Sequence, residues 1–240
     1  MSNRAKRNTA LSDNQRRGLP EYRKDPVALE TDWGPLATGG SNFATHNLQQ
    51  VDSGRWEFTP TRVTYLFIWL PTVFTVLSIP SSYLILTYLI DNQRMLSFIV
   101  TSLTGMGLIF GPLISWFMAH KLLRPAVFDR SRRLFWKGRR APDTPDDATT
   151  NNPCCRLDDI YALQILSETV TSHGHSHING HSNSHVRHRY QSYELNLVLK
   201  DGQRLNVVDH AGLSSIQRDA EQLAQLLQVP VWDKTLTTQP

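Results

Sequence analysis

The sequence predicts an α+β membrane protein, in which a transmembrane helical hairpin is joined to a small antiparallel β-sheet domain that a C-terminal amphipathic helix closes. Two long stretches, Val63 to Ile90 and Met95 to Ala119, contain no Asp, Glu, Lys or Arg. Segments on either side of them alternate apolar and polar residues with the period of two that strands show. Near the C-terminus, apolar residues recur at the helical spacing of three and four.

Both uncharged stretches are long enough to cross a membrane, because a helix needs about 20 apolar residues to span a hydrocarbon core of roughly 30 Å. The alternative is a pair of buried helices in a soluble core. Core helices normally turn a charged face to water, and the rest of the chain has too few apolar residues to enclose two helices on every side. The mean hydropathy of the whole chain, -0.34, conceals this uneven distribution. The 62 mostly polar residues ahead of the first stretch argue against a cleaved signal peptide.

The charges beside these stretches predict their orientation. Residues 121–140 contain eight Lys and Arg against one Asp, whereas the turn 91–94 contains one Asp and one Arg. Because basic flanks stay in the cytoplasm, we expect a multi-pass protein of the bacterial inner (plasma) membrane with both termini cytoplasmic. Pro71 and Pro80 should bend the first helix, and they keep a re-entrant hairpin as an alternative.

Gly107 and Gly111 form a Gly-x-x-x-Gly pair in the second stretch. Small residues at this spacing let the backbones of two membrane helices approach closely. We expect the pair to pack within the hairpin, since the short turn makes the two helices antiparallel neighbours. The alternative is a seam between two copies of the chain in a homodimer.

The segments before the hairpin are shorter and more polar. Residues 1–30 predict a disordered basic tail, because they have few apolar anchors. Such a tail would be attracted to an anionic membrane. Nucleic acid is the rival partner, but no aromatic-basic motif accompanies the tail. Residues 31–62 predict a short β-hairpin, with "HNLQQVD" and "RWEFTPT" on either side of Ser53-Gly54.

Residues 121–233 predict a cytosolic β-rich domain, followed by a tail at 234–240. "VFDR" and "RLFWKG" resemble a hairpin, "IYALQILSETV" a strand, and "YELNLVLKDGQRLNVVDH" a hairpin with a type I′ turn at Asp201-Gly202. With the hairpin before the membrane stretches this gives seven strands in one sheet domain. A helix should start at a capping box of Ser214 and Gln217 and end at Pro230.

This order of antiparallel strands and a closing helix resembles the pleckstrin-homology-like fold. "FDRSRRLFWKGRR", "IYALQILSE" and "AEQLAQLLQVPVWD" are similar to segments of poorly characterised two-span bacterial membrane proteins that carry such a domain, over roughly residues 31–233. The resemblance implies a non-catalytic cytosolic module held at the membrane. It carries over no site residue.

Three groups of residues are candidate sites. A metal such as zinc, copper or nickel has possible imidazole ligands in the loop 171–186 at His173, His175, His177, His181 and His185. The Gly and Ser residues between them favour a low-complexity loop that binds metal only weakly, so we expect no resident cofactor. A lipid head-group site, or merely a flank that sets orientation, is indicated by Arg130, Arg132, Arg133, Lys137, Arg139 and Arg140. Cys154 and Cys155 are expected to be plain loop residues.

No catalytic constellation is present in the sequence. The acidic pairs lie in loop-like segments, and neither uncharged stretch contains an ionisable Asp, Glu, Lys or Arg that would mark an ion path. We therefore expect no enzyme, but a membrane-anchored interaction or assembly module whose partners are the lipid bilayer and an unidentified protein. The alternative is a metal-buffering or metal-sensing membrane protein that uses its His-rich loop.

Overall fold

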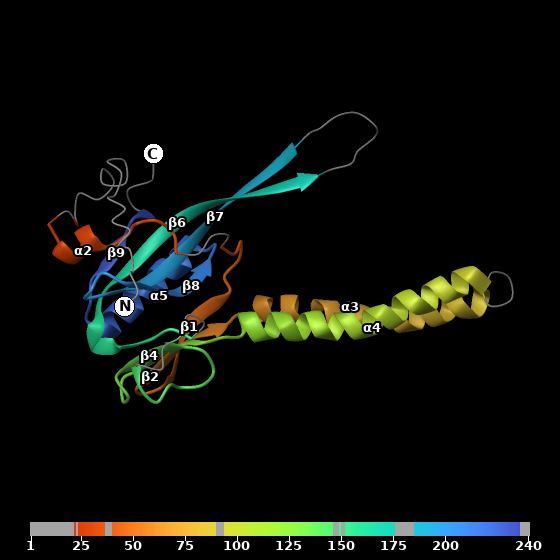
Figure 1. The fold of residues 1–240 in the computed structure, drawn as a ribbon, viewed down its shortest axis with the longest axis horizontal. Helices are drawn as coiled ribbons and strands as arrows, with labels where there is room; N and C mark the ends of the chain where they lie inside the picture. Colours follow the sequence, from red (N-terminus) through yellow and green to blue (C-terminus); the bar gives the residue numbers. More distant parts are fainter. Residues whose placement is uncertain are drawn as a thin grey trace, which may run out of the picture.

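The computed structural model describes residues 22, 24–36, 40–89, 94–145, 149, 152–175 and 185–235. A β-rich domain forms one end of the molecule, and a long helical hairpin stands out from it (Figure 1). The two ends of the described chain both lie in the β domain. The hairpin is thus an insertion in the domain and returns the chain to it.

The hairpin consists of α3 (Arg62–Leu89) and α4 (Arg94–Leu122), as the two uncharged stretches predicted. Each is roughly 42 Å long at 1.5 Å per residue, and α3 stays one helix through Pro71 and Pro80. Apart from Leu29, Leu36 and Val51, every exposed large hydrophobic side chain of the described residues lies on these two helices. The interpretation as core helices of a soluble domain is therefore wrong. Both helices are long and apolar enough to span a membrane.

The first sheet has five antiparallel strands in chain order, β1 (His46–Asp52), β2 (Arg55–Pro60), β3 (Ala126–Asp129), β4 (Leu134–Lys137) and β5 (Cys154–Arg156). β2 pairs with β3 across the hairpin, with Phe58 opposite Ala126. The hairpin is thus inserted after the second strand, as predicted. The pairing closes the base of the hairpin because each strand leads directly into or out of a helix.

The second sheet has the order β8 (Arg204–His210), β7 (His185–Leu199), β6 (Ile160–His175) and β9 (Val231–Asp233). The predicted hairpin between β7 and β8 forms, but its turn is not type I′, because only Gly202 has a positive φ, 76°. The Gly202 N–H donates to the Leu199 carbonyl (2.9 Å) and the Leu199 N–H to the Gln203 carbonyl (2.8 Å). This is a three-residue turn ending in a left-handed glycine.

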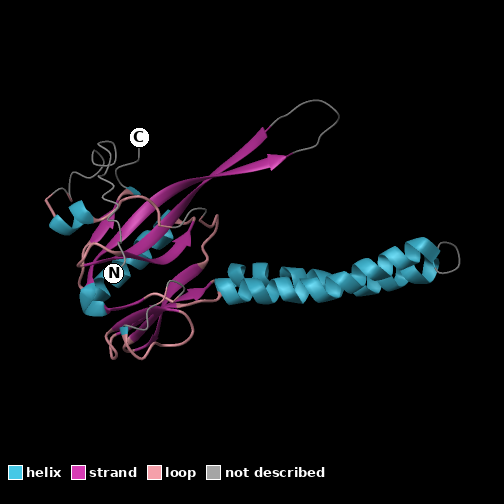
Figure 2. Cartoon of the chain, viewed as in Figure 1, coloured by secondary structure: helices cyan, strands magenta, loops and turns pink. Residues whose placement is uncertain are grey.

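Two sheets, rather than one seven-stranded sheet, enclose the core. α5 (Leu213–Leu227) packs into the same core and contacts β1, β6, β7 and β9. Figure 2 draws helices of the β domain in cyan beside its magenta strands. The buried cluster combines side chains of both sheets and of α5, among them Phe58, Phe128, Phe135, Leu163, Leu197, Ile216, Ala220 and Leu223. The helical stripe is thus core, as its spacing predicted. β5 and β9 were not predicted, because strands of three residues carry no periodic signal.

The start of α5 differs from the predicted capping box. Its N-cap is Gly212, which has no side chain to accept a hydrogen bond from the first turn. Gln217 Nε2 instead donates to Asp233 Oδ2 on β9 at 2.7 Å. The capping box does not form, because the fold places the Asp233 carboxylate of a neighbouring strand within reach of the Gln217 amide.

Part of the predicted disordered tail is folded. α2 (Pro26–Glu30) and Trp33 cover the outer face of the second sheet. Trp33 is 1% exposed and stacks between Tyr22 (centroids 5.7 Å apart) and Trp232 (5.6 Å). The sequence hides this contact because its partners stand at opposite ends of the chain. Residues 1–21 of the predicted tail lie outside the described residues.

Candidate functional site

A cavity lies where the helical hairpin joins the β domain. It has a volume of about 440 Å³. Its wall combines the segment before β1, the domain ends of α3 and α4, the end of β4 and β8, and it is lined by Gly40, Ser41, Phe43, Thr45, His46, Phe67, Met118, Lys121, Leu122, Arg124, Lys137, Val207, Val208 and Asp209. The site is therefore built from both parts of the molecule.

The domain side of this cavity is polar. Lys137 Nζ reaches from the first sheet to the second and donates to Asn206 Oδ1 at 2.8 Å, while Asn206 Nδ2 donates to Asp209 Oδ1 at 2.7 Å. Burial lowers the pKa of Lys137, against the attraction of Asp209 and Glu194, and the nearby Arg124 lowers it further. Burial likewise raises the pKa of Asp209, against the Asn206 hydrogen bond and the charge of Lys137. The Lys137 ammonium thus sits in a place poor in water.

The helix side of the cavity is apolar and ends in two cations. Phe43 and Phe67 stack with their ring centroids 5.0 Å apart. On α4, the Lys121 ammonium lies 4.8 Å from the centroid of the Phe117 ring. Just beyond the helix end, Arg124 Nε donates to the His120 carbonyl at 3.2 Å. The cavity therefore combines an apolar wall on the hairpin side with the positive charges of Lys121 and Arg124.

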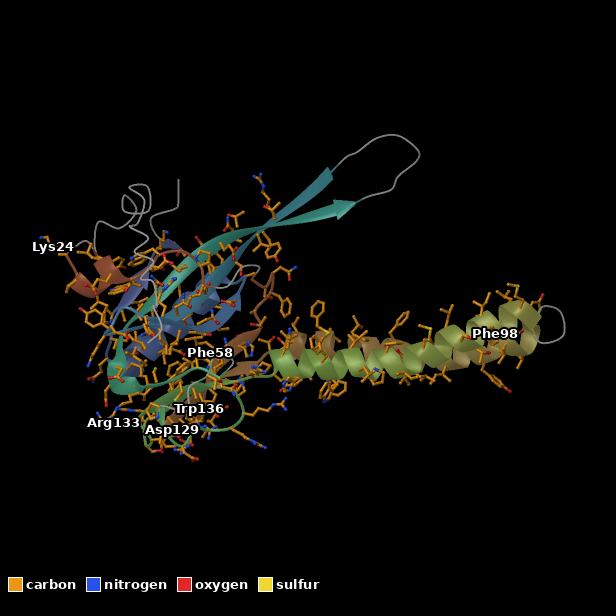
Figure 3. All side chains as sticks on the ribbon, viewed as in Figure 1. Lys24, Phe58, Phe98, Asp129, Arg133 and Trp136 are labelled. Carbon is orange, nitrogen blue, oxygen red and sulfur yellow. The ribbon has the colours of Figure 1, made fainter. Side chains whose placement is uncertain are left out.

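The basic run 130–140 does not form one patch. β3 and β4 are an antiparallel pair with Asp129 opposite Leu134 and Ala126 opposite Lys137. This register places Arg130, Arg132 and Arg133 in the turn at the end of the domain away from the helices, where Figure 3 labels Arg133. Lys137 lies at the helix end, and the Gly138 N–H donates to the Pro125 carbonyl at 2.8 Å. Arg139 and Arg140 follow that contact and are exposed.

The distant turn has structural roles of its own. Ser131 Oγ and the Arg132 N–H donate to Asp129 Oδ1 at 2.6 and 2.9 Å. Arg133, at a positive φ of 55°, donates to Asp158 Oδ1 at 2.6 Å. Phe135 and Trp136, between the two groups of cations, are buried. Both side chains pack into buried apolar clusters and therefore belong to the sheet core.

Gly107 and Gly111 face the other helix of the hairpin. A Cβ atom on Gly107 would lie 3.3 Å from Thr75 Cγ2, and one on Gly111 would overlap Thr75 Oγ1 and lie 3.1 Å from the Pro71 carbonyl oxygen. Hydroxyl pairs flank them, with Thr72 Oγ1 donating to Ser115 Oγ and Thr104 Oγ1 to Ser82 Oγ, both at 2.8 Å. Within this chain the pair therefore lies against α3.

The histidines are divided between strands and the segment that joins them. β6 extends to His175 and β7 begins at His185, so both ends of the predicted loop 171–186 are strand. The register pairs the backbone of His175 with that of His185 and the backbone of His173 with that of Arg187. His177 and His181 lie outside the described residues. Among the residues whose side chains the structure describes, no three His, Cys, Asp or Glu form a metal site.

Cys154 and Cys155 are not loop residues, because they form β5 and are buried. Burial, with smaller contributions from Cys154 and Asp159, raises the pKa of Cys155 to about 12. A thiol in this state is a poor nucleophile and a poor metal ligand.

The cavity was missed in the sequence, although one signal pointed to it. Lys137 follows Phe135 at the strand period of two, so a lysine stands on the inward face of β4.

No family model matches the chain, and no curated protein or solved structure is significantly similar to it.

Proposed function

We propose that the chain is a two-span membrane protein whose hairpin anchors the β domain at the cytoplasmic face of the bacterial inner membrane, where the domain is a non-catalytic interaction or assembly module. The observation that carries this proposal is the exposed apolar surface of α3 and α4. Soluble proteins rarely expose a large continuous apolar patch, because its burial is favourable by about 25 cal/mol per Å². A lipid bilayer would cover the exposed apolar side chains on all sides of the hairpin.

The lengths of the helices support full spans. About 20 helical residues cross a hydrocarbon core of roughly 30 Å, which from the hairpin tip reaches back to about Leu70 on α3 and to about Ile114 on α4. Trp69 and Trp116 then lie at the domain-side interface, where amphipathic rings are favoured. A re-entrant hairpin, the alternative that Pro71 and Pro80 raised, would have to sink the same two helices into a single leaflet.

The charges at the base of the hairpin support a cytoplasmic domain. Lys121 lies in the last turn of α4, Arg124 follows its end, and Arg139 and Arg140 follow β4 near Pro125. Short basic flanks of this kind stay on the cytoplasmic side. Two sheets, antiparallel except for the parallel pair of β6 and β9, with a C-terminal helix in their core are compatible with the pleckstrin-homology-like resemblance, which motivates the role as an interaction module.

Membrane fractionation and cysteine labelling test this proposal. We expect the chain to remain with membranes after alkaline carbonate washing. The variant Asn92→Cys, altered between the two helices, should react with a membrane-impermeant maleimide added to intact spheroplasts, whereas Ser53→Cys should react only after lysis. Cys154 and Cys155 give little background because they are buried. Extraction by carbonate would contradict the anchor, and an unreactive Asn92→Cys variant in intact spheroplasts would favour the re-entrant alternative.

A second candidate function, metal buffering or sensing, is supported by the register of β6 and β7. Residues directly opposite in an antiparallel pair have Cβ atoms roughly 5 Å apart, which suits the pairing of His175 with His185 for two ligands of zinc, copper or nickel. Calorimetric titration of the full chain with each metal tests it. Replacing His173, His175 and His185 by Ala should weaken binding by about tenfold or more, while replacing His177 and His181 should not. Equal losses would favour a flexible, nonspecific tract.

A further inference from the structure

The cavity at the base of the hairpin has an excess of positive charge. Three lining side chains are cationic, Lys121, Arg124 and Lys137, and one is acidic, Asp209. Asp209 is already hydrogen bonded to Asn206, and the nearby Glu194 does not line the cavity. Lys137 is buried, and Lys121 and Arg124 lie toward the solvent. Such an arrangement attracts an anion, because a low local dielectric around the buried cation weakens screening. The pKa of Lys137, lowered by burial and by Arg124, is consistent with such a place.

The shape of the cavity restricts the kind of anion. Phe67 of α3 and Met118 and Leu122 of α4 form its wall on the hairpin side. If the hydrocarbon edge lies near Ile114, the Lys121 backbone stands about 10 Å further along the helix, just outside a head-group layer of roughly 5–7 Å. Its ammonium lies over the Phe117 ring, one turn back toward the membrane, and so approaches that layer. A small soluble anion would use only the cations. A phospholipid would use the cations through its phosphate and the apolar wall through its acyl chain.

We propose that this cavity binds the phosphate of an anionic phospholipid, such as a phosphatidylglycerol, from the leaflet around the base of the hairpin. Lys121, Arg124 and Lys137 surround the phosphate, and Phe67 and Met118, on the membrane side of Lys121, contact the first part of the acyl chain. The bound lipid joins α4 to the β domain, since Lys121 belongs to one and Lys137 to the other. This inference rests on the proposed membrane anchoring.

Binding of short-chain lipids to the purified, delipidated full chain in a neutral detergent tests the proposal. The probes are dioctanoyl phosphatidylglycerol, dioctanoyl phosphatidylcholine, inorganic phosphate and glycerol 3-phosphate, followed by native mass spectrometry and calorimetry. We expect the anionic lipid to bind at least about tenfold more tightly than the zwitterionic one. The two soluble phosphates should not displace it even in large excess.

Two charge-matched variants separate the cavity from general surface charge. Lys121→Gln with Arg124→Gln should weaken lipid binding by roughly tenfold or more, as the loss of charged hydrogen bonds predicts. Arg130→Gln with Arg132→Gln removes the same charge from the distant turn and should change binding by less than about twofold. Met118→Trp, which fills the cavity and keeps every cation, should also weaken binding.

Three results would overturn the inference. Equal losses in the two charge-matched variants would show a diffuse attraction, equal binding of both lipids would show no head-group site, and displacement by free phosphate would identify a soluble anion as the ligand. Each of these outcomes can occur in a protein that fractionates with membranes. Failure of the inference is thus distinguishable from failure of the anchor, which the carbonate wash and the labelling of the Asn92→Cys variant report separately.

Discussion

Replacing Gly111 by Ala tests how the two long helices hold together. The new Cβ would overlap Thr75 Oγ1 and lie 3.1 Å from the Pro71 carbonyl oxygen. The optimal separation of two such non-bonded heavy atoms is about 3.5 Å. The helices must therefore part locally by up to about 1 Å, which forfeits as much as roughly half of the nearby dispersion energy. The same movement lengthens the Thr72–Ser115 hydrogen bond, 2.8 Å in the native hairpin and worth about 0.6 kcal/mol in a membrane.

Gly105→Ala is the matched control, because a Cβ at Gly105 meets nothing within 4 Å. Both substitutions gain up to about 1 kcal/mol of helix propensity, and only Gly111→Ala costs the roughly 1–3 kcal/mol of overpacking. The free energy of unfolding should therefore differ between the two variants by about 1–3 kcal/mol.

Titration of the purified full chain with dodecyl sulfate in neutral micelles, followed by circular dichroism, measures this difference. Equal effects of the two substitutions would refute the packing of Gly111 against Thr75. A change in oligomeric state at constant stability would instead assign the glycine to a seam between two copies of the chain.

Three further predictions concern the β domain. Trp33→Ala should cost about 3–5 kcal/mol of stability and speed the hydrogen exchange of residues 25–36, and unchanged exchange would mean that this segment is held by other contacts. Burial raises the pKa of Asp129, but hydrogen bonds from the following turn and the charge of Arg55 lower it below its ordinary 3.8. The contribution of the Asp129 carboxylate to stability is therefore present above pH 3.8 and is lost as the pH falls through the folded-state pKa. Asp129→Asn should flatten the fall of the urea midpoint below about pH 4, and an unaltered slope would argue against those hydrogen bonds. Cys155, with its pKa raised to about 12, should resist iodoacetamide at about pH 8, near the ordinary thiol pKa, until the chain is denatured, and rapid reaction of the native chain would contradict the burial of β5.

The sequence by itself predicted the features that short-range patterns control. The absence of charge over residues 63–90 and 95–119 identified both long helices, because an uncharged run of this length is typical of a helix that could span a membrane. Alternation along residues 193–199 identified the principal strand of the second sheet, and the stripe from Ile216 to Leu227 identified α5. Local chemistry was less reliable at the turn after Leu199 and at the capping of α5, where a long-range contact with Asp233 prevailed.

Only the tertiary structure decided which distant residues meet. Trp33 and Trp232 stack although most of the chain separates them. The pairing of β3 with β4 separates the Arg130–Arg133 end of the basic run from Lys137, and the joining of α4 to the sheets places Lys121 and Lys137 in the wall of one cavity. The physical reason is that burial, strand pairing and charge density depend on neighbours in space. A linear pattern determines the period of each segment, and the packing of the segments determines where their charges gather.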